Sequence, residues 1–188
     1  YVYAPLRHAE WNGLTPTDLV FPFFMFIMGV SMFFSLRKYD FKLTKTSFWK
    51  VKKRAVLIFL VGFAINFLVT LLYNGWEGMK ELRILGVLQR LALAYGFGSF
   101  IGLTINHKYL LHTAAAFLLG YAALLGFTGS TELSEGNLIA VIDRALFGPT
   151  HMYHDYLPDG TRIAFDPEGL LSCLGSIGHV LIGFYAGK

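Results

Sequence analysis

The sequence predicts an all-α fold: a polytopic membrane bundle of about five transmembrane helices in a single domain, residues 1–188. Apolar residues make up 55% of the chain and charged residues only 15%, a balance that is unusual for a soluble domain. The apolar residues also form long runs, and a helix needs roughly 20 of them to cross a bilayer. Helices are expected because an open sheet would leave backbone polar groups unpaired in lipid.

Five runs are long enough to serve as spans. The first contains Asp18 as its only charged residue, the third contains Gln89 and Arg90, and the others carry no charge. The chain has no internal repeat and no Pro/Gly/Ser linker, so one bundle is expected rather than two domains. The predicted spans cover residues 16–36, 55–73, 84–105, 109–127 and 169–187.

The distribution of charge predicts the topology. Eight of the sixteen Lys and Arg residues lie in residues 37–54, between the first two spans, and the positive-inside rule makes this segment cytoplasmic. Alternation then places His8, the connection 74–83 and the long connection 128–168 outside. The last of these is acidic and contains a short amphipathic pattern at 136–147. The basic segment therefore indicates topology and contact with anionic lipid, and a nucleic-acid partner is not expected.

Cysteine and histidine spacing predicts no metal site. Cys173 is the only cysteine, so no intrachain disulfide is possible, and the pair His151 and His154 lacks further ligands at a suitable spacing. No signal peptide is visible, and the chain does not begin with Met. We therefore expect a piece of a larger polytopic membrane protein, in the inner membrane if the source is bacterial.

Polar residues gather toward the outer ends of the first, third and fifth predicted spans. His8 lies just before the first span, and its imidazole can accept a proton or an acyl group near neutral pH. Arg90 lies roughly 9 Å into the third span at ~1.5 Å per residue. It can snorkel to the outer head groups or face the bundle, where Asp18 is the obvious candidate partner. His179 is expected to bond a serine of another helix.

Two of the acidic positions also fit helix starts. In Thr15-Pro16-Thr17-Asp18, the threonine suits an N-cap and the aspartate the first turn of the helix. Asp166-Pro167-Glu168 repeats this pattern before the fifth span. Capping and a role in a functional site do not exclude each other.

Four stretches together resemble one family. They are His8-Ala9-Glu10-Trp11-Asn12-Gly13-Leu14-Thr15, Asp18-Leu19-Val20-Phe21-Pro22, Arg83-Ile84-Leu85-Gly86-Val87-Leu88-Gln89-Arg90, and Phe165-Asp166-Pro167-Glu168-Gly169-Leu170-Leu171. In the order and the residues of these stretches, the chain resembles the transmembrane acyltransferases typified by heparan-α-glucosaminide N-acetyltransferase. The resemblance implies that acetyl-CoA is supplied from the cytosol and that a glucosamine amine is acetylated on the opposite face. It makes His8 the catalytic residue, and Asn12 and Arg83 match motif positions.

The resemblance and the residues together predict an acyl-CoA-dependent transferase. It would move an acetyl or other acyl group to an amino sugar or glycan outside, with His8 as base or acyl acceptor and Asn12 stabilising the oxyanion. A transporter or channel for a small polar solute and a non-catalytic membrane scaffold stay open as alternatives, as does a homo-oligomer. The residues expected to bind substrate or support the site are Asp18, Arg83, Gln89, Arg90, Asp166 and Glu168.

Overall fold

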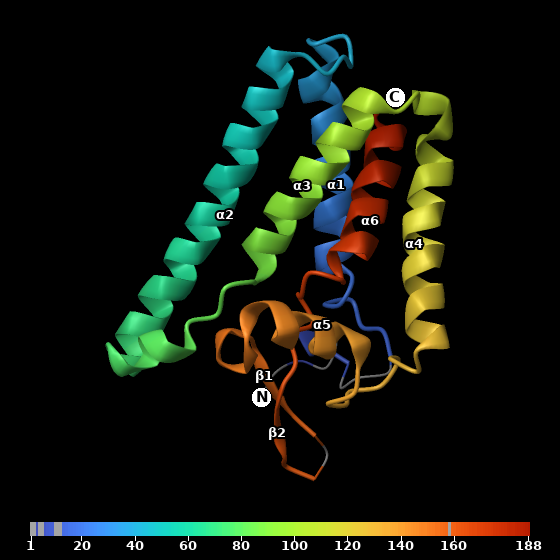
Figure 1. Ribbon diagram of the computed structural model, residues 1–188. Coiled ribbons are helices and arrows are strands. Elements are labelled where there is room, and N and C mark those ends of the chain that lie inside the picture. The colour runs from blue at the N-terminus through green and yellow to red at the C-terminus, as the bar shows by residue number, and fades with distance from the viewer. Residues whose placement is uncertain (1–2, 4–5, 10–12, 158) are drawn as a thin grey trace.

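In the computed structural model, the chain forms a bundle of long helices with a small cap of irregular structure at one end (Figure 1). The structure describes residues 3, 6–9, 13–157 and 159–188. Within these residues, three helical stretches are long and apolar enough to cross a membrane: Val20–Arg37, Lys45–Asn74 and His107–Phe127. The protein is therefore an integral membrane protein of the all-α class. The bundle helices are α1 (Val20–Arg37), α2 (Lys45–Asn74), α3 (Val87–Thr104), α4 (Leu110–Phe127) and α6 (Cys173–Ala186).

Helix α6 lies inside the bundle, against α1, α3 and α4, whereas α2 packs chiefly on α3 (Figure 1). Glycines allow the close approach of α1 and α6: a Cβ at Gly29 would lie 2.1 Å from the Val180 carbonyl oxygen, and one at Gly183 would lie 2.0 Å from that of Phe26. Small residues serve the same purpose at many helix contacts in membranes. The fully buried Phe184 then fills the centre of the core.

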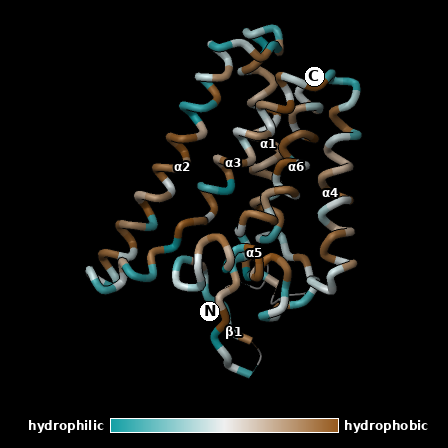
Figure 2. Tube along the Cα trace, in the orientation of Figure 1, coloured by the Kyte–Doolittle hydropathy of each residue, from teal (hydrophilic) through white to brown (hydrophobic). Residues whose placement is uncertain are grey.

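Hydropathy follows this arrangement. Figure 2 shows apolar residues along the helices and hydrophilic residues gathered at the two ends of the bundle. On α2 only Ser47, Val51 and Gly62 are buried. Its apolar side chains therefore face outward, as suits a helix in contact with lipid.

The basic segment is largely helical. We predicted residues 37–54 as a connection, but α2 begins at Lys45 and includes the second half of that segment. A capping box sets this start, because Thr44 Oγ1 accepts a hydrogen bond from Ser47 N (3.2 Å) and Ser47 Oγ accepts one from Thr44 N (2.8 Å). The helix thus carries charge on its first turns and becomes apolar further along.

Three other helices begin later than the predicted spans. α3 begins at Val87 rather than at residue 84. α1 begins at Val20 and α6 at Cys173, whereas the predicted spans began at residues 16 and 169. Turns occupy residues 16–19 and 167–172. Side chains hold the second of these segments, because Leu170 N donates to Asp143 Oδ1 (3.0 Å) and Arg90 donates to the Ser172 carbonyl oxygen (3.2 Å).

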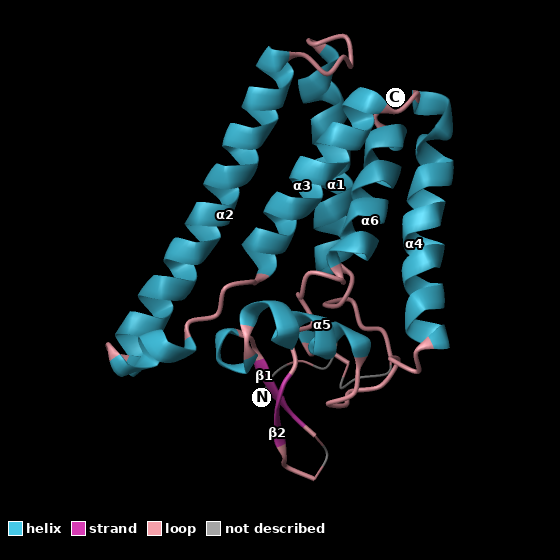
Figure 3. Ribbon diagram, viewed as in Figure 1, coloured by secondary structure: helices cyan, strands magenta, loops and turns pink. Residues whose placement is uncertain are grey.

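The connection between α4 and α6 folds into a small layered cap. It contains α5 (Leu138–Phe147) and an antiparallel hairpin of β1 (His154–Tyr156) and β2 (Arg162–Ala164), with His154 opposite Ala164 (Figure 3). Short 3-10 helices, η2 (Glu77–Glu81), η3 (His107–Tyr109) and η4 (Pro149–His151), complete the connections. The amphipathic pattern at 136–147 predicted a short helix here, and α5 confirms it. The hairpin was not expected, because strands of three residues show no readable alternation.

Candidate functional site

His8 forms a hydrogen-bonded pair with Asp18 at the end of the bundle where α1 begins. The distance from His8 Nδ1 to Asp18 Oδ1 is 2.6 Å. The imidazole is 74% exposed and the carboxylate 22% exposed. A carboxylate at Nδ1 favours the tautomer with the proton on that nitrogen, which leaves Nε2 free to accept a proton or attack a carbonyl carbon.

Asp18 is held in place by the segment that precedes it. Its Oδ2 accepts hydrogen bonds from Thr15 N (2.8 Å), Thr15 Oγ1 (2.8 Å) and Ala9 N (3.2 Å). The hydrogen bond from His8, followed by those from Thr15, holds the pKa of Asp18 well below its usual range. Asp18 was expected in the first turn of the helix, but α1 begins at Val20 with no side-chain cap, and the Asp18 carboxylate instead bonds the segment before it. It thus presents a permanent negative charge to the imidazole.

Arg90 does not pair with Asp18, so that prediction was wrong. Its guanidinium donates to Ser176 Oγ (2.7 Å) and to the carbonyl oxygens of Ser172 (3.2 Å) and Pro167 (3.5 Å). It also lies 4.6 Å from the centre of the Phe21 ring. Arg90 faces α6 and the turn before it, whereas Asp18 turns back toward the N-terminal segment. Among the described residues, no carboxylate oxygen lies within 4.0 Å of the Arg90 nitrogens.

Arg83 binds the two carboxylates of the Asp-Pro-Glu motif. Its Nε and Nη2 donate to Asp166 (2.9 and 2.7 Å), and Nη2 also lies 2.6 Å from Glu168 Oε2. Asp166 is 2% exposed and accepts further hydrogen bonds from Tyr153 N (3.2 Å) and Glu168 N (2.9 Å). Burial raises the pKa of Glu168, and the charge of Arg83 opposes that rise. Asp166 therefore fastens the turn before α6 to the connection before α3.

Asp143 is a buried residue of this region that the sequence analysis did not select. Its Oδ1 accepts from Leu170 N, while the buried Oδ2 has no hydrogen-bond partner among the described residues. Burial raises the pKa of Asp143 to about 6. A Cβ at Gly169 would lie 1.6 Å from Asp143 Oδ2, so the contact requires glycine there. Its position four residues after Ile139, on the apolar face of α5, was the available signal.

The other polar residues of the bundle lie apart from these groups. Gln89 is buried against α2, where a Cβ at Gly62 would lie 2.8 Å from its Oε1, and its Nε2 has no partner among the described residues. His179 Nδ1 bonds the Gly175 carbonyl oxygen of its own helix (2.9 Å), so the predicted bond to a serine of another helix was wrong. Asn12 lies outside the described residues. Those residues contain no cluster of three His, Cys, Asp or Glu suited to a metal ion.

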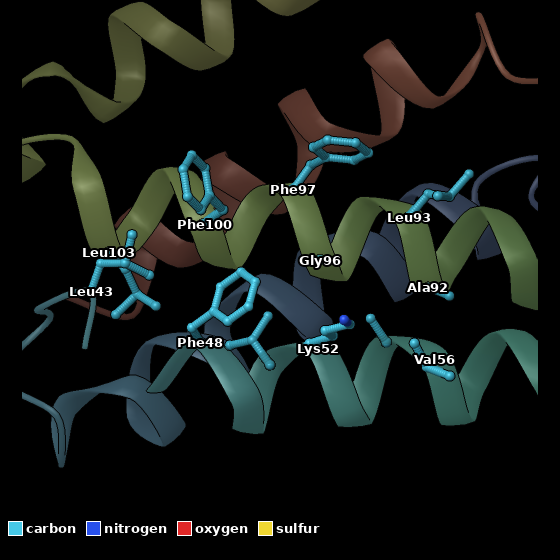
Figure 4. A pocket seen from close by; sticks show the side chains of 12 residues that line it. Leu43, Phe48, Lys52, Val56, Ala92, Leu93, Gly96, Phe97, Phe100 and Leu103 are labelled. Carbon is cyan, nitrogen blue, oxygen red and sulfur yellow. The ribbon is translucent and has the colours of Figure 1, made fainter. Parts of the chain in front are cut away.

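An apolar groove between α2 and α3 lies near their basic end (Figure 4). It has a volume of about 390 Å³, and Lys52 is the only charged residue that lines it. Phe48 and Phe100 border it on the two helices. Apart from Lys52 its lining is apolar, so the candidate site is the His8–Asp18 pair at the opposite end of the bundle, where two polar groups are hydrogen-bonded to each other.

The fold and the site define a class: an integral membrane protein with an exposed histidine bonded to an aspartate, and an arginine–carboxylate network around the buried Asp166, at one end of its helices. The chain belongs to the family described as a domain of unknown function (DUF5009), which matches residues 4–167.

Two curated proteins are similar to this chain in sequence. The heparan-alpha-glucosaminide N-acetyltransferases of Homo sapiens and of Mus musculus are each 30% identical to it over 239 aligned positions, which cover 99% of this chain. The chain spans about a third of their length, 34% and 35%. The resemblance read from the four motifs is thereby confirmed.

Proposed function

We propose that the protein is a membrane acetyltransferase that moves an acetyl group from acetyl-CoA to the amine of an amino sugar, with His8 as the central group. The sequence similarity to two N-acetyltransferases supports the reaction class. The His8–Asp18 pair carries the proposal, because it leaves a freely accessible imidazole nitrogen beside a fixed carboxylate. An acyl chain longer than acetyl, or a hydroxyl acceptor, would use the same groups.

Two routes use this geometry. In the first, His8 Nε2 removes a proton from the sugar amine as the amine attacks the thioester carbonyl carbon, and the thiol of CoA leaves. In the second, Nε2 itself attacks that carbon, forms an acetyl-imidazolium and releases CoA as the thiolate; the amine then takes the acetyl group from the ring, and the proton that the amine loses passes to the thiolate. In both, the ring becomes positively charged, and Asp18 stabilises that charge through Nδ1.

The other residues take supporting roles in the proposal. Asn12 donates to the oxyanion of the tetrahedral intermediate. Arg83, Asp166 and Glu168 position the turn before α6, and Arg90 fixes that turn to α3. Gln89 stabilises the contact of α3 with α2. Of the two carboxylates on Arg83, Glu168 is the more accessible, at 19% exposed against 2% for Asp166.

The proposed sidedness separates donor and acceptor. The basic start of α2 faces the cytoplasm and attracts the phosphates of acetyl-CoA, while His8 and residues 128–168 face the opposite side. Helix α1 has 18 residues and at ~1.5 Å per residue extends roughly 27 Å between these ends. The acetyl group therefore has to pass along the bundle to reach His8.

The test uses the full-length protein in liposomes. Wild type is expected to consume acetyl-CoA and acetylate glucosamine, and His8→Ala to lower the turnover number at least 100-fold. His112→Ala, an exposed histidine of α4, is the matched control and should keep the wild-type rate. Normal turnover by His8→Ala would remove His8 from the mechanism.

A transporter is a second candidate, favoured by Arg90 and by the amide nitrogen of Gln89 in α3, which has no partner among the described residues. Charged and polar groups inside helices often mark a solute path. It predicts flux of amino sugar into vesicles without acetyl-CoA. Acetylation that strictly requires the donor, with no flux in its absence, would exclude it.

A further inference from the structure

The groove between α2 and α3 is long and almost wholly apolar (Figure 4). Its lining on α3 runs from Ala92 to Leu103, a distance of roughly 17 Å at ~1.5 Å per residue. Small residues line it where the two helices approach each other: a Cβ at Gly96 would lie 3.6 Å from that of Ala55. An extended hydrocarbon chain fits this shape, whereas a polar ligand would find only Lys52 to bind.

A second apolar hollow adjoins the α2–α3 groove on the surface of α2. It has a volume of about 470 Å³ and is lined by α2 residues alone. Lys52 and Val56 line both the second hollow and the groove, so the two apolar spaces meet at one lysine. The remaining residues of the second hollow are Trp49, Lys53, Leu57 and Leu60. Two chains that share a single charged group would therefore find a place for each of their parts.

Lys52 and Lys53 have no negative partner within the described part of the chain, because no carboxylate oxygen there lies within 4.0 Å of either ammonium nitrogen. Lys52 Nζ lies 4.8 Å from the centre of the Trp49 ring, and Figure 4 shows its side chain between the two helices. Residues 37–54 contain eight Lys and Arg but only one acidic residue, Asp40. Basic pockets between transmembrane helices bind anionic lipid head groups, and tryptophan is enriched at the level of those head groups. The two ammonium groups are therefore open to a phosphate.

We propose that the α2–α3 groove and the second hollow hold the two acyl chains of one anionic glycerophospholipid, with its phosphate against Lys52 and Lys53. The inference does not depend on the proposed reaction. An acyl chain gains little on moving from the bilayer into the groove, because lipid tails are as apolar as leucine side chains. The charge of the head group therefore decides which phospholipid is held. Since the groove lies between α2 and α3, the bound lipid joins α2 to the rest of the bundle at this end.

Lipid retention by the full-length protein tests this site. Native mass spectrometry of the protein in detergent measures the binding of dioleoyl phosphatidylglycerol, dioleoyl phosphatidylcholine and one-chain lysophosphatidylglycerol, each at the same concentration. Wild type is expected to hold one phosphatidylglycerol, with a preference over phosphatidylcholine of about fivefold or more, because each lysine near an anionic head group contributes about this factor. Equal binding of these two lipids, or equal binding of lysophosphatidylglycerol and phosphatidylglycerol, would overturn the proposal.

Matched variants separate the site from net charge and from the general lipid surface. Lys52→Gln should lower the preference about fivefold, whereas Lys50→Gln, on the same helix but lining neither space, should change it less than about twofold. Val56→Trp fills the place where the two spaces meet and should weaken phosphatidylglycerol binding about fivefold. Val61→Trp is its control, because the two valines are 46% and 47% exposed and Val61 lines neither space. Equal losses in Lys50→Gln and Lys52→Gln would contradict the site.

Other occupants of the groove would give different results. Acetyl-CoA carries phosphates but no long chain, so an excess of it should not displace phosphatidylglycerol; displacement would make the basic end a donor site and overturn the lipid proposal. A second copy of the protein in the groove would appear as a dimer that Val56→Trp dissociates and that binds no phosphatidylglycerol, which would also overturn it. Selective lipid binding by a protein that transfers no acetyl group would reject the proposed function alone.

Discussion

The His8–Asp18 pair and the Arg83–Asp166–Glu168 network both hold carboxylates in hydrogen bonds at the same end of the bundle, but they differ in how buried they are and in how far apart their residues lie in the sequence. The first joins residues ten positions apart, and its imidazole is 74% exposed. The second joins residues more than 80 positions apart, around a carboxylate that is 2% exposed.

This difference in burial assigns the His8–Asp18 pair to the reaction and the Arg83 network to the stability of the fold. An exposed imidazole keeps a nitrogen free for a substrate, and a nearby carboxylate sets its tautomer without burying it. A guanidinium that is shared by two carboxylates has no such freedom, because removing it would leave the buried carboxylate of Asp166 without its charged partner. Changes in the pair should therefore lower activity with little effect on folding, and changes in the network should do the reverse.

The largest expected effect is on activity and comes from Asp18→Asn. The amide favours the wrong tautomer of His8 and cannot stabilise the charged ring, so the turnover number should fall about 10³–10⁴-fold. The measurement is acetyl-CoA consumption by full-length protein with glucosamine. Asp159→Asn, in the hairpin turn, is the control and should retain the wild-type rate. A fall of less than tenfold would show that Asp18 only holds the segment before α1 in place.

Arg83→Gln should give the largest effect on stability. Two carboxylates would lose their common partner, and removing one partner from a buried pair costs about 3–5 kcal/mol. The expected result is a clear drop in melting temperature in detergent, whereas Lys80→Gln, on an exposed pair, should change it little. A wild-type melting temperature for Arg83→Gln would show that the network does not stabilise the folded protein.

Gly169→Ala probes the contact between the network and α5. The added methyl group would meet Asp143 Oδ2 at 1.6 Å, so the turn before α6 has to shift, at a cost of about 1–3 kcal/mol. Gly136→Ala is the matched control, because nothing lies within 4 Å of a Cβ there. Equal melting temperatures for the two variants would show that the turn adapts freely.

The smallest effect is the pH dependence contributed by Asp143. Its pKa of about 6 in the folded protein lies above the ordinary value of 3.8, so the folded state binds the proton more tightly. Stability from this group is therefore full below about pH 4 and declines as pH rises toward 6. Asp143→Asn should remove this decline, seen as a pH-dependent difference in melting temperature from wild type between pH 4 and 7. A difference that stays constant with pH would contradict it.

The sequence predicted the apolar helices well, because long apolar runs leave few alternatives in lipid. It also selected His8 and Asp18 as candidate residues, but it expected Asp18 to pair with Arg90, whereas Asp18 bonds His8. Distance along a helix does not say which way a side chain turns around it, and Arg90 turns toward α6. Helix starts at Val20 and Cys173 depended on side-chain bonds that no hydropathy pattern contains.

Arg83 was selected only through the family resemblance, and its two carboxylate partners were not predicted. More than 80 residues separate them in sequence, and such pairings depend on how the connection 128–168 folds over the bundle. The buried position of Asp143 and the hairpin lie in the same connection and were not predicted either. Short strands and buried polar residues in irregular segments have weak local signals.

Chemical rescue tests the central claim, that a free imidazole nitrogen of His8 performs acetyl transfer, most directly. Full-length His8→Ala is assayed with acetyl-CoA and glucosamine, with and without imidazole in solution. We expect almost no product without imidazole and a rate that rises with imidazole concentration, while wild type does not respond. Wild-type turnover by His8→Ala, or an imidazole response equal to that of wild type, would contradict the account.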